Sequence, residues 1–251
     1  MRDISVITVV KDHAIGLQLT FESLLNQTFT NWEMIIVVAD SSDGTLPLAR
    51  QLQDKEPRVR LIEQNGKGIY QAMNEGIGFS EGIYTWFMNA GDKFASPEVV
   101  SNALNQFTNP ELGLILGSHK IAGSHRSFIN GHREGSIAAL SFAFNRRGGC
   151  HQAMIFRTET LKNLGGYDVS YALASDFDLV LRVIQESQAR KVSEIYTSIE
   201  PGGIADRQIF QVHREKHQIR QRLLGGWFVF SASLVWTFLA RVKILLRRIY
   251  S

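Results

Sequence analysis

Cysteine is almost absent from this chain of 251 residues, which contains only Cys150. No disulfide can therefore form within the chain, and a single thiol fits a reducing compartment. The first ten residues also lack a secretory signal, because one arginine is followed by an apolar run too short for such a signal. Internal repeats, long linkers and low-complexity segments are missing as well. We therefore expect a cytoplasmic protein without disulfides.

A basic surface spread over the whole protein is missing too, although the pI is about 9.0. The formal net charge is +3, but residues 206–251 carry nine Lys or Arg and two acids, which leaves the rest of the chain at −4. A nucleic-acid-binding protein would have its basic residues across the folded face, so this distribution argues against one. A basic tail mixed with apolar residues instead favours contact with an anionic membrane surface.

The composition is that of a globular protein, with 44% hydrophobic and 20% charged residues. The length allows one large domain or two small ones. The first hundred residues alternate two kinds of pattern. Apolar runs typical of buried strands cover Ile4–Val10, Glu33–Val38, Val59–Glu63 and Ile83–Met88. Helical patterns cover Gly16–Gln27, Leu48–Leu52 and Gly68–Gly78, and a further helix is expected to open at Ser96-Pro97-Glu98.

This alternation predicts a mostly parallel sheet with helices on both faces. Ligands of such sheets bind at the carboxyl ends of the strands. The stretches that follow the four strands are Lys11-Asp12, Ala39-Asp40, Gln64–Lys67 and Asn89–Asp92. Each Asp in them could equally be a helix cap or a turn residue. After about residue 110 the apolar runs become short, as at Leu114–Leu116 and Ala153–Phe156, which indicates a mixed second half packed on the sheet edge.

Several motifs follow one another in a characteristic order. They are Ser5–Val10, Ser41–Thr45, Gly68–Ile77, Phe87–Asp92, Cys150–Met154, Gly165–Asp168, Ser175–Leu179 and Gly202–Ile204. As a set, over roughly residues 4–205, the sequence resembles the family 2 glycosyltransferases, in particular bacterial exopolysaccharide enzymes of the colanic-acid type. The resemblance implies a GT-A-type α/β fold at 1–205, with a donor-nucleotide half at 1–110 and an acceptor half at 111–205. It leaves residues 206–251 as a helical tail.

The same resemblance implies a nucleotide-diphospho-sugar donor, Mg²⁺ or Mn²⁺, and an inverting transfer to an acceptor hydroxyl. Asp40 would accept a hydrogen bond from a nucleobase, although the usual stretch here has two acids followed by glycine. Lys67 would contact phosphate, unless it is a solvated loop residue. Asn74 would line the donor pocket, unless it caps a loop. The full set of expected donor-binding residues is Thr8, Val10, Asp40, Lys67, Asn74 and Asn89.

Asp92 stands where the family has its acidic metal motif, and it is the one acid in Asn89–Asp92. Mg²⁺ commonly takes one or two carboxylates together with phosphate oxygens and water, so one Asp is chemically sufficient. The metal would neutralise the leaving diphosphate. The alternative is that Asp92 only caps the loop before Phe94.

Ser175-Asp176-Phe177-Asp178 precedes an apolar helix at Leu179–Ile184. Ser175 and Asp178 match a capping box, which leaves Asp176 free to project from the helix start. Asp176 aligns with the catalytic base of the family, which takes the proton of the attacking hydroxyl. Further contacts to acceptor or diphosphate are assigned to His151, Gln152, Asp178, Arg207 and His213. Gly202-Gly203-Ile204 is expected to form a loop that closes over the donor.

The run Leu223–Ala240 contains no charged residue and is followed by Arg241, Lys243, Arg247 and Arg248. It is at the lower limit for crossing a bilayer, and its aromatic residues with basic flanks fit a helix lying in the membrane interface. The alternative is a helix that packs on the domain or in a dimer. Attachment would suit a lipid-linked saccharide acceptor and a position on the inner face of the cytoplasmic membrane.

The leading hypothesis is therefore a metal-dependent, membrane-associated glycosyltransferase. One alternative is a nucleotidyltransferase on a similar sheet, although no glycine-rich loop with Arg or Lys lies near the N-terminus. A second alternative is a non-catalytic sugar-nucleotide-binding or scaffold protein, suggested by the single acid of the metal motif.

Overall fold

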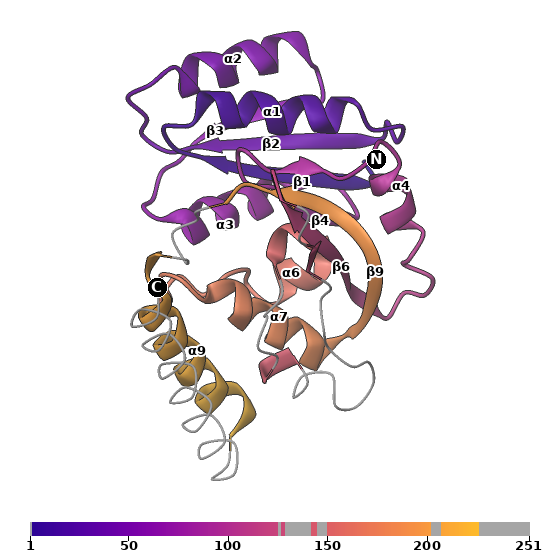
Figure 1. Cartoon of the computed structure of the whole chain (residues 1–251), viewed down its shortest axis with the longest axis vertical. Helices are drawn as coiled ribbons and strands as arrows, with labels where there is room; N and C mark the ends of the chain where they lie inside the picture. Colours follow the sequence, from indigo (N-terminus) through magenta and orange to yellow (C-terminus); the bar gives the residue numbers. More distant parts are fainter. Residues whose placement is uncertain (1, 125–126, 129–141, 145–149, 202–206, 226–251) are drawn as a thin grey trace.

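One large sheet runs through the protein, with helices on both faces (Figure 1). The computed structural model describes residues 2–124, 127–128, 142–144, 150–201 and 207–225. Within them the strands are ordered β3-β2-β1-β4-β8-β6-β9-β5, and β7 pairs with β6. The strands are β1 (Ile4–Val10), β2 (Trp32–Val38), β3 (Val59–Glu63), β4 (Tyr84–Phe87), β5 (Lys93–Phe94), β6 (Leu112–Ile121), β7 (Ser127–Phe128), β8 (Met154–Arg157) and β9 (Gln188–Ile199).

The predicted α/β fold with a mostly parallel sheet is confirmed. Strands β3, β2, β1 and β4 are all parallel, so their carboxyl ends meet at one edge of the sheet. The second half adds strands of both directions, because β8 runs antiparallel to β4 and β6 while β9 is parallel to β6. The carboxyl ends of β6 and β9 therefore reach the same edge as those of the first four strands.

Alternate residues of β1 enter two separate cores, as expected for a strand covered on both faces. Val6 and Val10 pack with α1 (Ala14–Leu25), α2 (Thr45–Lys55) and α4 (Val99–Leu104). Ile7 and Val9 pack against the other layer. That layer contains α3 (Ile69–Phe79), α6 (Thr158–Asn163), α7 (Ser175–Glu186) and α9 (Ile209–Leu224).

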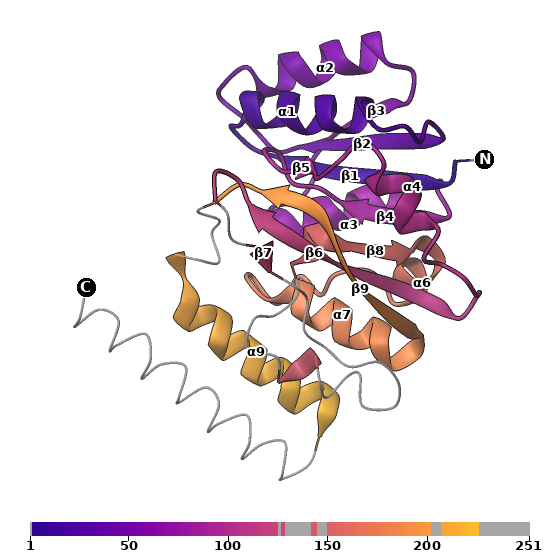
Figure 2. The ribbon, with the colours of Figure 1, turned by 45° about the vertical axis from the view of Figure 1, so that its right-hand side comes forward.

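Helix α9 packs on the outside of α7, where Figure 2 shows the two helices side by side. Ile219 is fully buried in the same core as Leu179 and Val183 of α7. The sequence predicts a helical tail after residue 205, and the described part of that tail, α9, packs in the same core as α7. In the part of the chain that the structure describes, no helix is both long and apolar enough to cross a membrane. Most of Leu223–Ala240 lies outside the described residues.

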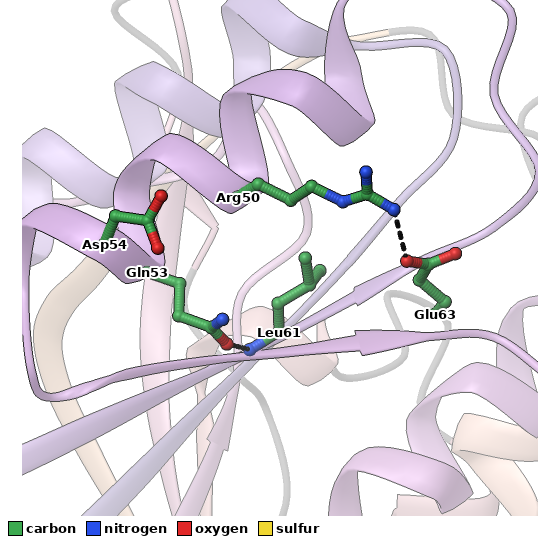
Figure 3. A pocket seen from close by; sticks show the side chains of 5 residues that line it. All are labelled: Arg50, Gln53, Asp54, Leu61 and Glu63. Atoms are coloured by element: carbon green, nitrogen blue, oxygen red, sulfur yellow. Dashed lines mark hydrogen bonds and ion pairs between the residues drawn. The ribbon is translucent and has the colours of Figure 1, made fainter.

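The edge strand β3 is covered by α2 (Figure 3). Arg50 forms an ion pair of 2.8 Å with Glu63, and Gln53 Oε1 accepts a hydrogen bond of 2.7 Å from the Leu61 N–H. Capping an edge in this way prevents another strand from adding to it. The shallow depression that these side chains line therefore belongs to the packing of α2 on the edge strand.

The helix predicted to open at Ser96-Pro97-Glu98 is present, but its first residues differ from the expectation. Helix α4 begins at Val99, after Ser96-Pro97-Glu98, and no side chain caps it. The Pro97 carbonyl instead accepts hydrogen bonds from the backbone and the hydroxyl of Thr28, and the Ser96 carbonyl accepts one from Gln27. The segment is therefore used to bind the end of α1, which the local sequence does not reveal.

Two glycines of α3 provide a matched test of this packing. A Cβ on Gly76 would come within 2.5 Å of Ile7 Cγ2, whereas a Cβ on Gly78 would meet nothing within 4 Å. We expect Gly76→Ala to cost about 1–3 kcal/mol through overpacking, less the helix propensity that alanine gains. Gly78→Ala should stabilise by about 0.5–1 kcal/mol. Thermal unfolding of the two variants checks both, and equal Tm values would contradict the close helix–strand contact.

Candidate active site

The loops that follow β1 and β2 are bound to each other. Asp12 has a left-handed backbone with φ 48°, and its carboxylate accepts a hydrogen bond of 2.6 Å from the Ser42 N–H. The Ser41 hydroxyl accepts a bond from the Asp12 N–H, and Asp43 accepts one from the Ala14 N–H. Asp40 lies exposed in the same loop pair. The two loops form one rim at the carboxyl end of the sheet.

Helix α1 binds the loop after β4 through the side chain of Thr20. The Thr20 hydroxyl donates to the Asp92 carbonyl at 2.8 Å and accepts a bond of 3.0 Å from the Gly91 N–H. Gly91 has φ 101°, and a Cβ there would come within 2.2 Å of a Glu200 carboxylate oxygen. Glycine is thus required at this position both by its backbone angle and by the approach of Glu200.

The Asp92 carboxylate is 3% exposed and joins three distant segments. Its Oδ1 accepts a hydrogen bond of 2.9 Å from the Glu200 N–H, just after β9. Its Oδ2 accepts one of 3.0 Å from the Gln152 side-chain amide in the short helix η1 (His151–Ala153). The Cys150 thiol donates to the other end of the Gln152 amide, which fixes the orientation of that amide. Burial raises the pKa of Asp92 above its ordinary value.

A second carboxylate, that of Asp176, lies beside His151. Asp176 Oδ2 is 3.6 Å from His151 Nδ1, and His151 Nε2 is 3.4 Å from Asn89 Nδ2. The Asn89 amide donates to Nε2, so the remaining proton of a neutral imidazole lies on Nδ1, toward Asp176. The Asp176 side chain is 25% exposed, so solvent and small groups can reach it.

Asp176 stands at the start of α7, but its helix is capped differently from the prediction. The capping box is wrong, because the Ser175 hydroxyl is buried with no partner among the described residues. Within the first turn the Asp176 Oδ1 accepts a hydrogen bond of 2.7 Å from the Phe177 N–H. Just before the helix, Glu215 Oε2 of α9 accepts bonds of 2.9 Å from the N–H groups of Leu173 and Ala174. Burial raises the pKa of Asp176, but His151 and the charge of Lys216 outweigh it and bring the pKa below its ordinary value.

Two buried aromatic rings lie near Asp176. Tyr70 stacks on Tyr167 with ring centroids 5.2 Å apart. Burial raises the pKa of both phenols, so they remain protonated at neutral pH. These two rings are neutral neighbours of the carboxylate.

Asp178 does not reach this group, contrary to its assignment to acceptor or diphosphate. The residue is fully buried, and its carboxylate binds Arg182 at 2.8 Å and also Arg222. Arg222 binds Asp168 as well, at 2.6 Å. The carboxylate therefore ties α7 to α9 and to the loop after α6, and it has no oxygen directed to the site.

Three residues expected to bind the donor make contacts inside the fold. Both ends of the Asn74 amide bind the backbone of Tyr167, at 2.7 and 2.8 Å, so Asn74 holds a loop, the alternative left open by the sequence. Thr8 and Val10 are buried inside the sheet layer, at 0% and 5% exposure. Their side chains support the strand end and do not reach its surface.

The remaining predicted residues are spread more widely. Lys67 is exposed in the loop before α3, and Arg207 is exposed just before α9. His213 is half-buried in α9. Gly148-Gly149 and Gly202-Gly203-Ile204 lie outside the described residues. The structure thus brings together Asn89, Asp92, His151, Gln152 and Asp176.

Four further residues support this group and were not predicted from the sequence. They are Thr20, Glu200, Glu215 and Lys216. Thr20 carried a signal, because it interrupts the apolar stripe formed by Leu17, Phe21 and Leu24. The other three carried none, since each acts on a partner more than 35 positions away in the sequence.

A divalent cation fits Asp92. The donors that hold this buried carboxylate are neutral amides, and each oxygen keeps a further lone pair. The negative charge of Glu200 nearby adds to the cost of ionising Asp92. Among the described residues no three His, Cys, Asp or Glu side chains are grouped to hold a metal. A cation bound here would therefore complete its shell with substrate oxygens and water, as Mg²⁺ often does.

Relatives in sequence are glycosyltransferases. An uncharacterized glycosyltransferase of Mycobacterium tuberculosis is 29% identical over 184 residues, which cover 71% of this chain and 68% of the relative. A PGL/p-HBAD biosynthesis glycosyltransferase of Mycobacterium bovis is 24% identical, with the same coverage. Chondroitin synthase of Escherichia coli is 26% identical over 205 residues, or 78% of this chain, but this chain spans only 29% of that longer protein.

Solved structures share the fold. The mannosyltransferase PcManGT of Pyrobaculum calidifontis, in complex with GDP-Man and Mn²⁺, superposes with a TM-score of 0.69 at 15% identity, over 90% of this chain and 65% of that one. Residues 1–349 of S. aureus TarS, in complex with UDP-GlcNAc, give 0.68 at 16% identity, over 94% of this chain and 72% of that one. This chain spans 40% of a longer TarS chain.

The sequence model of glycosyl transferase family 2 matches residues 5–165, which is more than half of the chain. This match includes the loop after β4 and the His151-Gln152 segment. The chain therefore belongs to glycosyl transferase family 2, and it is an enzyme that transfers sugar on a GT-A fold.

Proposed function

We propose that this enzyme transfers a sugar from a nucleotide-diphospho-sugar to an acceptor hydroxyl with inversion, and that Asp176 is the catalytic base. The observation that carries the proposal is the contact of 3.6 Å between His151 and a partly exposed Asp176 whose pKa lies below its ordinary value. A carboxylate that is ionised at neutral pH and open to solvent can accept a proton from an approaching hydroxyl.

In the proposed step the acceptor oxygen attacks the anomeric carbon while Asp176 takes its proton. The bond between that carbon and the diphosphate oxygen breaks, and the nucleoside diphosphate leaves with the electron pair. A single displacement of this kind inverts the anomeric configuration. His151 orients Asp176 through Nδ1, and Asn89 orients His151 through Nε2.

The donor is proposed to lie along the carboxyl ends of β1, β2 and β4. The rim formed by Asp12, Asp40 and Ser42 offers carboxylate and hydroxyl groups to a nucleoside. The related folds of TarS and PcManGT hold UDP-GlcNAc and GDP-Man, which supports a sugar nucleotide here. Lys67, in the exposed loop after β3, is proposed to contact a phosphate.

Asp92 is proposed to hold Mg²⁺ or Mn²⁺. Such a cation would supply positive charge for the diphosphate that leaves. Gln152 and the Glu200 N–H keep the Asp92 carboxylate in one orientation, with lone pairs free for the cation. The Mn²⁺ complex of PcManGT, which shares the fold, supports this assignment.

The acceptor is proposed to be a lipid-linked saccharide at the inner face of the cytoplasmic membrane. The support is the uncharged run Leu223–Ala240 with the basic residues that follow it. Arg207 and His213, which precede this run, are proposed to face the acceptor or the diphosphate. The naming of one relative for PGL/p-HBAD biosynthesis and of another as chondroitin synthase is compatible with a surface glycan product.

Asp176→Asn tests the base. The amide keeps the size of the side chain but cannot take a proton, so turnover should fall by about 10²–10⁴-fold. Binding of the donor, measured by calorimetry, should be unchanged. Asp54→Asn, at an exposed position of α2, is the control. The assay supplies UDP-, GDP- and dTDP-sugars with a membrane extract, and NMR of the product reads its anomeric configuration. Full turnover of Asp176→Asn, or a retained configuration, would refute the proposal.

Asp92→Asn tests the metal site. The neutral amide is a poorer ligand for a hard cation, so Mn²⁺ titrations followed by electron paramagnetic resonance should show a loss of the bound ion. In the wild-type enzyme, Mn²⁺ and the matching nucleoside diphosphate should raise the Tm together by more than either does alone. Glu98→Gln, at an exposed carboxylate before α4, serves as the control. Equal Mn²⁺ affinity in Asp92→Asn and wild type would remove Asp92 from the site.

A further inference from the structure

A small cavity lies beneath the start of α7, directly beside Asp176. Its apolar lining includes Phe142, Met154 and Phe177, and three polar side chains face it: His151, Asp176 and Lys216. Lys216 comes from α9, a helix that follows the segment matched by the family model. Lys216 of α9 therefore lies at the same cavity as the proposed base.

The surroundings of Lys216 are unusual for a lysine. The residue is half-buried, and its Nζ lies 5.0 Å from the centre of the Phe177 ring, a cation–π distance. Burial lowers the pKa of Lys216, the positive charge of Arg220 lowers it further, and the Asp176 carboxylate opposes both. An ammonium partly removed from water is costly unless an anion lies near it, and Asp176 is the carboxylate that lines the same cavity as Lys216.

Helix α9 is anchored on both sides of Lys216. The preceding residue, Glu215, binds the two N–H groups in front of α7. One turn later Arg220 donates a hydrogen bond of 2.8 Å to the Ala143 carbonyl, and Ile219 is fully buried. Because these contacts fix the helix, the ammonium of Lys216 is directed at the cavity.

We propose that Lys216 is a positioning residue for Asp176, so that α9 is a working part of the active site. Its ammonium acts on the carboxylate through its charge across the cavity, and the imidazole of His151 contacts the carboxylate directly, so the support comes from two elements, α9 and η1. The inference rests on the proposed role of Asp176 as base. It assigns Lys216 no contact with the sugar or the reacting atoms.

The expected pH dependence follows from all the groups that face Asp176. His151 from η1 and Lys216 from α9 favour its ionised form, while Tyr70 from α3 and Tyr167 from the loop after α6 are neutral. Glu215 is bound to the backbone before α7. Removing the Lys216 charge should therefore raise the pKa of Asp176. A base works only above its pKa, so the acid limb of kcat/KM should move to higher pH.

The experiment compares Lys216→Met, Lys216→Gln and Lys216→Arg in the full chain. In assays at saturating Mn²⁺, which keeps Asp92 ionised, the two neutral variants should move the acid midpoint of kcat/KM upward by about one pH unit, and Lys216→Arg should keep it near the wild-type value. Donor binding, read by calorimetry, should be unchanged in all three. Arg214→Met, at an exposed position of the same helix, is the control and should leave the profile unmoved.

A merely structural role predicts a different result. It would lower the Tm and the height of the profile without moving the midpoint, and that outcome would overturn the inference. Unfolding of both neutral variants at 20 °C would assign Lys216 to packing and would also count against it. Full turnover in Asp176→Asn would overturn the proposed function itself. Loss of turnover in Asp176→Asn with an unmoved midpoint in Lys216→Met would overturn only the role of Lys216.

Discussion

The Asp92 carboxylate links three loop segments at the edge of the sheet where the candidate site lies. A buried carboxylate must be hydrogen-bonded, because leaving it bare in the interior is costly. Its two bonds come from Gln152, which precedes β8, and from the Glu200 N–H, which follows β9. The hydrogen bonds to this one carboxylate therefore fix the loop after β4, the short helix η1 and the end of the last strand. The rest of the site is built on that junction, since His151 is the residue next to Gln152.

Asp176 is placed both by its own helix and by tertiary contacts, since its Oδ1 accepts a hydrogen bond of 2.7 Å from the Phe177 N–H and its Oδ2 lies 3.6 Å from His151. No side chain of the preceding residue caps α7, and Glu215 of α9 binds the N–H groups of Leu173 and Ala174 directly in front of it. Asp178 is buried, and its two carboxylate oxygens form ion pairs with Arg182 and Arg222. Asp176 is consequently the acid of this motif that remains available to solvent. Helix α9 thus contributes, through Arg222, to leaving Asp176 and not Asp178 open to solvent.

The sequence carries most of the fold and part of the site. The apolar run of Ile4–Val10 predicts a strand covered on both faces, and its alternate residues do enter two cores. The order of the motifs along the chain predicts Asp92, His151 and Asp176 as site residues, and the structure brings them together around η1. The capping box at Ser175 and Asp178 was wrong, because local spacing cannot register Glu215 or Arg222, about forty residues further on. The sequence likewise could not decide between the two roles of Asn74, because its partner Tyr167 is 93 positions away.

The two site carboxylates are supported by opposite kinds of neighbours. Asp92 is held by neutral amides, and burial raises its pKa, so its ionised form gains most from a cation that arrives with the substrate. Asp176 faces His151 and Lys216, and its pKa is lowered, so it is ionised without help from outside. Environments that shift the pKa values of two carboxylates in opposite directions usually indicate different roles in one reaction. The difference is a physical reason to place the cation at Asp92 and the proton transfer at Asp176, and not the reverse.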